Sequence, residues 1–394
     1  MRVLLVNDYE PDSGPIIGGC EVVVRTLRDA LRARGHDVAV FSGTDAGGLR
    51  TFWNYVRNKR AERALADRLH EFRPEVVHFH NIYHRLSPYV LGVPRVAAQG
   101  AAVVMTAHDG HLACPNPTFT RFGPDNAVSI ELGSHRWTES EVRGARWDHR
   151  GPLYSGLRVQ QHLRSYRRDR LHEHIGRVIC PSRFLEDVLH DGGLPTEHVP
   201  PPVERQSPGT QSRPSDGPLR LVFAGRLERE KGLEAFLRAA PADGSWRLDV
   251  YGVGDEAQKL RAIAPGATFH GHVSHGKVCR AIASSHVLIA TSLCPENAPA
   301  AVLEAASSGT AVLGGNLGGT PEIVQETGCG VVVDPFDGNS IANGLGELMA
   351  RRYADRLNAF DASEYFAQRT PERHAMRVEA VYHGLLEGAA ACAS

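Results

Sequence analysis

Short runs of consecutive apolar residues alternate with longer amphipathic segments along most of this chain. In the first half these runs lie at residues 3–8, 38–42, 76–80, 103–109 and 177–182. Their apolar residues are consecutive rather than alternate, which is typical of strands buried on both faces of a parallel sheet. The segment after the first run carries Leu27 and Leu31 at helical spacing and closes at Gly35, a common helix stop. The pattern predicts repeated β-α-β units with right-handed crossovers.

The alternation stops once and then begins again. Residues 199–218 are dense in Pro, Ser and Gly and lack a helix or strand period, which is typical of a linker. Further apolar runs follow at 219–225, 247–252, 267–273, 286–292, 310–315 and 330–335. The 394 residues also exceed the roughly 250–300 that a single core supports. We therefore expect an α/β protein of two Rossmann-like, doubly wound parallel-sheet domains, at 1–200 and 218–370, with a linker at 201–217.

Two segments do not fit this repeat. Residues 371–394 are helical in pattern with no strand after them, so this C-terminal helix could cross back onto the first domain. Residues 112–170 lack a strand signal and are rich in Arg, His and aromatic residues. Long irregular insertions in α/β domains are more often functional than not.

Charge and composition exclude several classes of function. The chain has 44 Lys and Arg against 45 Asp and Glu, so its net charge of −1 does not draw it to nucleic acid. No apolar run approaches the ~20 residues of a membrane-spanning helix, and the N-terminus carries no export leader. Seven scattered cysteines without a C-x-x-C pair are typical of reduced thiols. We expect a soluble cytoplasmic protein without a nucleic-acid partner; its oligomeric state stays open.

Two local basic clusters remain. They comprise Arg57, Lys59, Arg60 and Arg63 in one segment and Arg164, Arg167, Arg168 and Arg170 in another. Such runs are usually solvated faces of helices. The aromatic residues Phe52, Trp53 and Tyr55 beside the first cluster favour an alternative, which is peripheral contact with an anionic acceptor or with lipid at the inner membrane face.

A basic loop follows the first strand of the second half. The segment GRLEREKG at 225–232 places Arg226 and Lys231 just beyond a strand's carboxyl end, where open α/β sheets bind ligands. Two cations with a glycine on either side suit a diphosphate. The alternative is a solvated loop in which the two cations pair with Glu228 and Glu230.

A helix start after the strand at 286–292 favours the diphosphate. We expect Asn297 to cap this helix and Pro299 to lie in its first turn, so that the amides near Ala298 and Ala300 form an anion site.

Two glutamates bracket this helix start. Glu296 precedes the helix and Glu304 lies two turns along it, which separates them by roughly 10 Å at 1.5 Å per residue. Carboxylates at these places can accept hydrogen bonds from a sugar and from a ribose on either side of a diphosphate. The alternative is a glutamate that complements the helix dipole and an unrelated exposed one.

The first half offers weaker candidates, also at loops after strands. Gly18 and Gly19 precede a helix and could approach a phosphate or sugar, although a tight turn explains them equally well. His108 and Asp109 end the run 103–109, and the histidine is a candidate for donor orientation or proton handling. His80 and Asn81 are expected to line the cleft on the acceptor side. The histidines near them lack a carboxylate or thiolate partner, so we predict no metal site.

Together these motifs resemble the retaining GT-B glycosyltransferases of glycosyltransferase family 4. The resemblance rests on the glycines at 18–19, TAHDGHLACPN at 106–116, GRLEREKG at 225–232, ENAPAAVLE at 296–304, SSGTAV at 307–312 and GGTPEIV at 318–324. It spans nearly the whole chain, and the order and spacing of the motifs make it specific. It implies a GT-B fold, in which two Rossmann-like domains face a central cleft.

The resemblance also implies roles for the candidate residues. Arg226 and Lys231 would hold the diphosphate, Glu304 the ribose and Glu296 the hydroxyls of the transferred sugar. Further donor contacts would come from Asn297, Ala298, Pro299 and Ala300, from Val273, and from Gly18 and Gly19. His108 would approach the sugar, whereas His80, Asn81 and Asp109 would serve the acceptor.

The expected function is therefore metal-independent, cofactor-free transfer of a hexosyl unit with retention. UDP-sugars are the favoured donors, with GDP-mannose second. The acceptor is a hydroxyl of a polysaccharide or lipid-linked intermediate, or of a small natural product. Alternatives are a sugar-nucleotide epimerase or phosphorylase of the same fold, and a non-catalytic sugar-binding module.

Overall fold

The computed structural model describes residues 1–12, 18–43, 54–203, 213 and 216–393. The chain divides into two compact units, Met1–Pro202 with Pro371–Ser394, and Val203–Thr370. Phe52, Trp53 and most of the expected linker lie outside the described residues. Among the described residues no helix is long and apolar enough to span a membrane.

The first unit is built on six parallel strands in the order β2-β1-β3-β4-β7-β8. Their bounds are β1 Arg2–Asn7, β2 Asp37–Ser42, β3 Val76–Phe79, β4 Ala102–Thr106, β7 Arg177–Cys180 and β8 Thr196–His198. The main helices are α1 Gly19–Ala33, α3 Lys59–Phe72, α4 Val93–Ala97, α7 Arg183–Asp191 and α15 Pro371–Ala393. The sequence analysis missed β8, because its residues are only half-buried and carry no apolar run.

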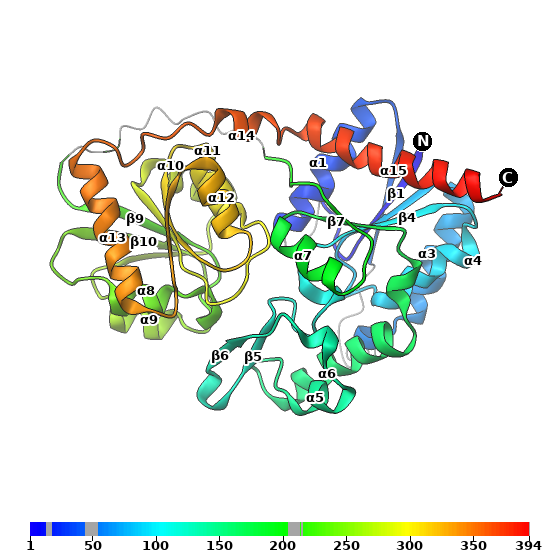
Figure 1. Cartoon of the computed structure of the whole chain (residues 1–394), viewed down its shortest axis with the longest axis horizontal. Helices are drawn as coiled ribbons and strands as arrows, with labels where there is room; N and C mark the ends of the chain where they lie inside the picture. The colour runs from blue at the N-terminus through cyan, green and yellow to red at the C-terminus, as the bar shows by residue number, and fades with distance from the viewer. Residues whose placement is uncertain (13–17, 44–53, 204–212, 214–215, 394) are drawn as a thin grey trace. The chain divides into compact units, whose positions relative to one another are not determined.

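Each face of this sheet has its own hydrophobic core. Leu4 and Val6 of β1 pack in one core with α3 and α7. Val3 and Leu5 pack in the other with α1 and α15, and Figure 1 shows α15 running beside α1. Consecutive residues of β1 thus face opposite cores, which explains why the strand is apolar throughout.

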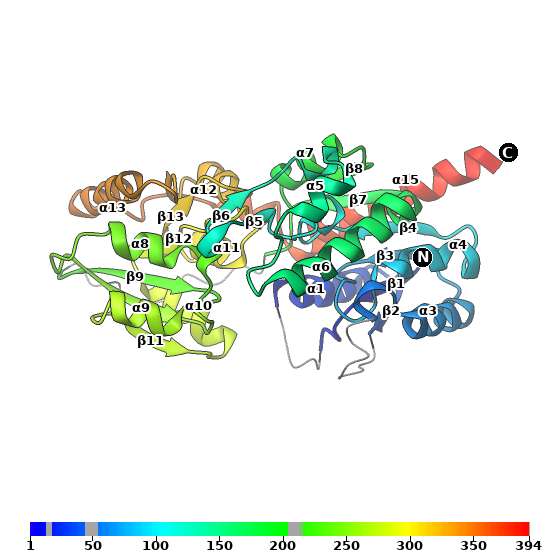
Figure 2. The same ribbon diagram turned by 90° about the horizontal axis from the view of Figure 1, so that it is seen from below.

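The insertion at 112–170 contains a hairpin that the sequence analysis did not expect. Strands β5 Thr120–Phe122 and β6 Val128–Ile130 pair antiparallel, followed by α5 Glu139–Gly144 and α6 Pro152–His162. These elements form one group in both views (Figure 1, Figure 2). Trp147 is fully buried and its Nε1–H donates to the Val142 carbonyl over 2.8 Å. Strands of three residues are too short to show a period, so the sequence pattern did not reveal them.

The second unit carries a second sheet of six parallel strands, in the order β11-β10-β9-β12-β13-β14. The strands are β9 Leu219–Ala224, β10 Trp246–Tyr251, β11 Thr268–Gly271, β12 Val287–Ala290, β13 Ala311–Gly315 and β14 Gly330–Val333. The helices are α8 Leu233–Ala239, α9 Ala257–Ile263, α10 His275–Ser284, α11 Ala300–Ser307, α12 Thr320–Thr327, α13 Gly338–Tyr353 and α14 Ser363–Ala367. Helices α8, α9 and α13 cover one face, and α10, α11 and α12 cover the other (Figure 1).

Both strand orders contain a point where the direction of winding reverses. In the second unit this switch point lies between β9 and β12, and in the first unit between β1 and β3. Helices leave such neighbouring strands on opposite faces, which opens a crevice at the carboxyl edge of the sheet. The fold class expected from the sequence is confirmed, and it places the candidate loops at these two crevices.

A buried hydrogen-bond chain joins α15 to the first sheet. The Tyr382 hydroxyl lies 2.7 Å from Nδ1 of His78, whose Nε2 lies 2.8 Å from the Thr106 hydroxyl. All three side chains are buried, and burial lowers the pKa of His78 to about 3. The imidazole is therefore neutral at pH 7, and each of its nitrogens has a partner.

We predict that Tyr382→Phe lowers the free energy of unfolding by about 1–3 kcal/mol, because it leaves a buried imidazole nitrogen without its partner. Urea denaturation followed by circular dichroism measures the change. Tyr353→Phe is the matched control, since Tyr353 is 84% exposed. Equal stability of both variants would show that the hydrogen bond to His78 contributes nothing.

Candidate active site

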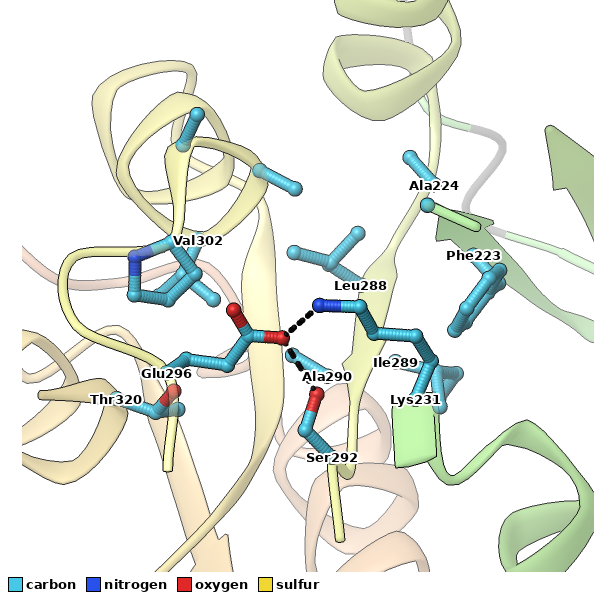
Figure 3. Close-up of a pocket in the computed structure, with 14 residues that line it drawn as sticks. Phe223, Ala224, Lys231, Leu288, Ile289, Ala290, Ser292, Glu296, Val302 and Thr320 are labelled. Atoms are coloured by element: carbon cyan, nitrogen blue, oxygen red, sulfur yellow. Dashed lines mark hydrogen bonds and ion pairs between the residues drawn. The ribbon is translucent and has the colours of Figure 1, made fainter. Parts of the chain in front are cut away.

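A pocket occupies the switch point of the second unit. It lies at the carboxyl ends of β9 and β12 and at the start of α11, and its volume is about 170 Å³. Its lining comprises Phe223, Ala224, Gly225, Lys231, Leu288, Ile289, Ala290, Ser292, Glu296, Pro299, Ala300, Ala301, Val302 and Thr320. Figure 3 shows the two charged side chains of this lining, Lys231 and Glu296, pointing towards each other.

Lys231 reaches the pocket because the loop after β9 lies tightly against the end of β12. Gly232, which follows the lysine, has a φ of +71°, a left-handed conformation that favours glycine. A Cβ atom there would lie 1.8 Å from the Thr291 carbonyl oxygen. The glycine expected to close this loop is therefore required both by its conformation and by the close approach.

Lys231 and Glu296 form a half-buried ion pair. The lysine Nζ donates to Oε1 of Glu296 over 2.5 Å, and the Ser292 hydroxyl donates to the same oxygen over 3.0 Å. Burial lowers the pKa of Lys231 and raises that of Glu296, but the attraction between them outweighs burial and shifts both pKa values the other way. Both groups are therefore charged at neutral pH. In Figure 3 the second carboxylate oxygen points away from the lysine.

The backbone of Glu296 is fixed by the loop after β13. Glu296 and Gly318 form an isolated parallel bridge, and the Gly319 N–H donates to the Glu296 carbonyl over 2.7 Å. Gly318 has a φ of +67°, and a Cβ atom there would lie 2.1 Å from that carbonyl oxygen. The glycine motif at 318–324 therefore holds Glu296 in place as well as starting α12.

The helix start differs from the sequence expectation in one respect. Helix α11 begins at Ala300 with Pro299 as its N-cap, so the prediction that Asn297 caps it was wrong. The bridge to Gly318 holds Glu296 in extended backbone, and Asn297 and Ala298 form a bend before the helix can begin. Pro299 makes no side-chain cap hydrogen bond, and Pro299 and Ala300 line the pocket. The start of α11, where helices bind anions, thus lies at the pocket.

Arg226 lies where expected, just beyond β9, but its guanidinium is engaged in its own loop. Nη1 lies 2.5 Å from Oε1 of Glu228 and Nη2 lies 3.6 Å from Glu230. Its side chain is 60% exposed and does not line the pocket. The ion pairs of the solvated-loop alternative are therefore present for Arg226, whereas Lys231 turns into the pocket.

The remaining donor candidates of this unit are Glu304 on α11 and Val273 after β11. Glu304 points to α10, where its Oε1 lies 3.6 Å from Nε2 of His275. Burial raises the pKa of Glu304, and the nearby His275 opposes that rise. Val273 is half-buried, follows β11 and packs on the core under α11. Neither Glu304 nor Val273 lines the pocket.

Gly18 and Gly19 begin α1 in the first unit. Gly18 is the N-cap in extended backbone, and its N–H donates to the carboxylate of Glu21 over 2.9 Å. A Cβ atom at Gly19 would meet nothing within 4 Å, so the space in front of this residue is open.

The histidine candidates of the first unit form a pair in which His80 is buried and His108 is half-buried. Nδ1 of His80 lies 3.0 Å from Nε2 of His108, and burial lowers both pKa values, that of His108 to about 4. Asp109 instead accepts the ring N–H of His111 over 2.6 Å. Burial would raise the pKa of Asp109, but His111 outweighs it and lowers that pKa. Asn81 is tied to the strand ends, since its N–H donates to the Asn7 side chain over 3.1 Å.

Part of the predicted basic clusters is paired. Arg57 donates to Glu62 over 2.9 Å and lies over the ring of Tyr89. Arg167 donates to the Ser134 carbonyl over 2.8 Å, and Arg170 pairs with Glu173.

Sequence reasoning missed two features of the second unit. Ser292 shares the carboxylate of Glu296, and its only signal is a hydroxyl beyond a strand end. His275, Cys279 and Glu304 form the group of His, Cys and acidic residues, among those described, that could hold a metal ion. Their signal is a His-x-x-x-Cys spacing, which is meaningful only once α11 is known to lie beside α10.

Comparisons with known proteins give a consistent result. A model described as "Glycosyltransferase Family 4" matches residues 17–206, and one described as "Glycosyl transferases group 1" matches residues 218–351. Glycogen synthase of Mycobacterium tuberculosis is 27% identical over 384 residues, which cover 89% of this chain and 86% of that protein. A GDP-mannose-dependent phosphatidylinositol monomannoside mannosyltransferase of the same organism is 26% identical over 392 residues and 92% of both chains.

Solved structures agree on the fold. Sucrose-phosphate synthase from Thermosynechococcus elongatus has a TM-score of 0.72 at 18% identity and covers 98% of this chain and 99% of its own. An Anabaena protein in complex with UDP-glucose has a TM-score of 0.66 at 15% identity, covering 98% and 100%. These likenesses confirm the expected GT-B fold class.

We predict that Gly318→Ala destabilises the protein by about 2–5 kcal/mol. The estimate adds ~1–2 kcal/mol for a left-handed residue with a side chain and ~1–3 kcal/mol for overpacking against Glu296. Thermal unfolding compares it with Gly266→Ala, a site with a negative φ and nothing within 4 Å of the new Cβ. An unchanged melting temperature in Gly318→Ala would contradict the role of this contact.

Proposed function

The chain belongs to glycosyltransferase family 4 and is a retaining glycosyltransferase with a nucleotide-sugar donor, and we propose that it transfers a hexosyl unit from a UDP-sugar bound at the pocket of the second unit. The observation that carries this assignment is the Lys231–Glu296 pair at the start of α11, in the pocket. GDP-mannose is the second candidate, because curated relatives are named as GDP-mannose-dependent. The solved Anabaena relative with UDP-glucose supports the first candidate.

The diphosphate would lie between the lysine and the helix start. Lys231 supplies a full positive charge, and the first amides of α11 supply partial positive charge and donors. Arg226 would join them by leaving Glu228, because an exposed ion pair of this kind contributes only about 0–1 kcal/mol. Departure of the nucleoside diphosphate builds negative charge, which Lys231 and the helix amides would stabilise from the positions that they already hold.

The two glutamates would hold the two sugars. The Glu296 carboxylate keeps one oxygen on Lys231 and Ser292 and directs the other away from them, where sugar hydroxyls could donate to it. Glu304, about one turn along α11, would accept hydrogen bonds from the ribose. No residue of the pocket lining other than Glu296 carries a carboxylate or thiolate that could act as a nucleophile. We therefore favour attack by the acceptor hydroxyl on the face that the diphosphate leaves.

We assign the acceptor to the first unit, with His80, Asn81 and Asp109 as contact candidates and His108 as a group that orients the transferred sugar. Because burial keeps His108 neutral at pH 7, it can donate or accept a hydrogen bond but carries no charge. A polysaccharide or lipid-linked intermediate, or a small natural product, is the proposed acceptor class.

We predict that Lys231→Ala and Glu296→Gln each lower turnover of the nucleotide sugar by about 10²–10³-fold, the effect typical of removing one electrostatic contact to the leaving group or sugar. Release of the nucleoside diphosphate from the sugar donor, with water or an added acceptor, measures turnover. Lys259→Ala is the matched control, since this exposed lysine also pairs with a glutamate in the same unit. Wild-type turnover in both pocket variants would exclude the pocket as the donor site.

We predict that saturating UDP raises the melting temperature by roughly 5–10 °C. A ligand at 100 times its Kd stabilises by about 2.7 kcal/mol, and each kcal/mol is worth ~2–4 °C in a unit of this size. GDP should give a smaller shift, and Lys231→Ala should abolish both. A larger shift with GDP would move the assignment to GDP-mannose.

A further inference from the structure

Three side chains with metal-binding chemistry converge where α10 and α11 lie side by side. Nε2 of His275 lies 3.4 Å from Sγ of Cys279 and 3.6 Å from Oε1 of Glu304. One ligand atom from each residue lies within 4.8 Å of the other two. No other group of this kind occurs among the described residues.

The positions follow from the helices. His275 and Cys279 are four residues apart on α10, so they occupy neighbouring places on one helix face. Glu304 lies in the middle of α11, which packs on α10. The site therefore needs both helices, and each helix is held by the core beneath it.

The separations suit tetrahedral zinc. Bonds of about 2.0–2.1 Å to nitrogen and oxygen and about 2.3 Å to sulfur place neighbouring ligands roughly 3.3–3.6 Å apart in a tetrahedron. The two separations from Nε2 of His275 fall within that range, and the third, between Cys279 and Glu304, is within 4.8 Å, so a bound ion would draw these two ligands together by at most about 1.5 Å. Thiolate and imidazole also select zinc over magnesium or calcium, which prefer oxygen ligands.

The burial of the three side chains suits a metal site that solvent can reach. Cys279 is buried and the Glu304 side chain is 17% exposed, whereas the His275 side chain is 68% exposed. An ion could thus reach His275 from solvent and then also bind the two less exposed ligands, Cys279 and Glu304. A thiolate and a carboxylate would balance the charge of one divalent ion.

We propose that His275, Cys279 and Glu304 bind one Zn²⁺, with a water molecule as fourth ligand, and that bound zinc excludes the nucleotide sugar. The exclusion rests on the proposed function, because it requires that Glu304 also binds the ribose. The metal site itself does not. Zinc here acts as an inhibitor of donor binding and takes no part in the transfer.

Titration of the purified full chain with Co²⁺, a spectroscopic substitute for Zn²⁺, tests the site directly. We expect one equivalent to bind with a sulfur-to-cobalt charge-transfer absorption that Zn²⁺ displaces. Cys279→Ser should lose this absorption, and His275→Ala should weaken metal binding by at least about 10–100-fold, the cost of disturbing even an outer partner of a metal site. Because His275 is exposed, its variant remains informative if Cys279→Ser does not fold.

Two matched variants serve as controls. Cys329→Ser removes another buried thiol of the same unit, and His272→Ala removes an exposed histidine near α10. Both should bind Co²⁺ as the wild-type chain does. Unchanged binding in His275→Ala, or loss of the absorption in Cys329→Ser, would overturn the site.

Competition separates the two parts of the proposal. Saturating UDP or GDP should weaken Co²⁺ binding, and zinc should remove the nucleotide's thermal shift in the wild-type chain but not in His275→Ala. Independent binding of metal and nucleotide would overturn the exclusion. Failure of both nucleotides to bind would overturn the proposed function and with it the exclusion, while the cobalt absorption still decides the metal site.

Discussion

Burial of both faces of each parallel sheet is the constraint on which this structure depends. Strands such as β1 and β12 place consecutive side chains in two different cores, so a polar group within a strand is tolerated only where it is fully hydrogen-bonded, as His78 is in β3. Polar groups that could meet a ligand are therefore found where strands end. At a switch point the loops of two neighbouring strands diverge to opposite faces, and the crevice between them can admit a ligand.

The Lys231–Glu296 ion pair lies beyond two such strand ends, those of β9 and β12. Both charges are largely withdrawn from water, and removing an ion pair from water costs about as much as the attraction returns. Such a pair therefore need not stabilise the fold. Its position in a pocket suggests instead that it binds a ligand. The backbone contact between Glu296 and Gly318 joins the loops after β12 and β13, and thereby sets the direction of the carboxylate and the start of α11.

The two units use the same sheet edge with different electrostatics. The pocket of the second unit holds a charged Lys231–Glu296 pair at a helix start, and its lysine and helix amides suit an anionic leaving group. The edge of the first unit holds His80 and His108, which burial keeps neutral. Neutral imidazoles suit the hydrogen bonds of a sugar or of an acceptor hydroxyl. This contrast supports the proposed division of donor and acceptor between the units.

The sequence by itself determined the fold class, the positions of the buried strands of both sheets except β8, and the placement of Lys231 and Glu296 beyond strand ends. The strands could be predicted because burial on both faces requires runs of consecutive apolar residues, which are visible in the sequence. The two charged residues could be placed because their positions depend only on how far they follow a strand. Tertiary structure alone decided that Pro299 replaces Asn297 as the N-cap, because the reason lies in a bridge to Gly318. It also decided that Arg226 pairs within its loop.

The group formed by His275, Cys279 and Glu304 was likewise decided by tertiary structure. The residues come from two helices, and only packing of α10 on α11 brings their ligand atoms together. Periodicity reports which face of a segment is buried, but it carries no information about which other segment covers that face. Local patterns therefore predicted the framework of this protein, whereas contacts between segments distant in sequence decided how its side chains are combined.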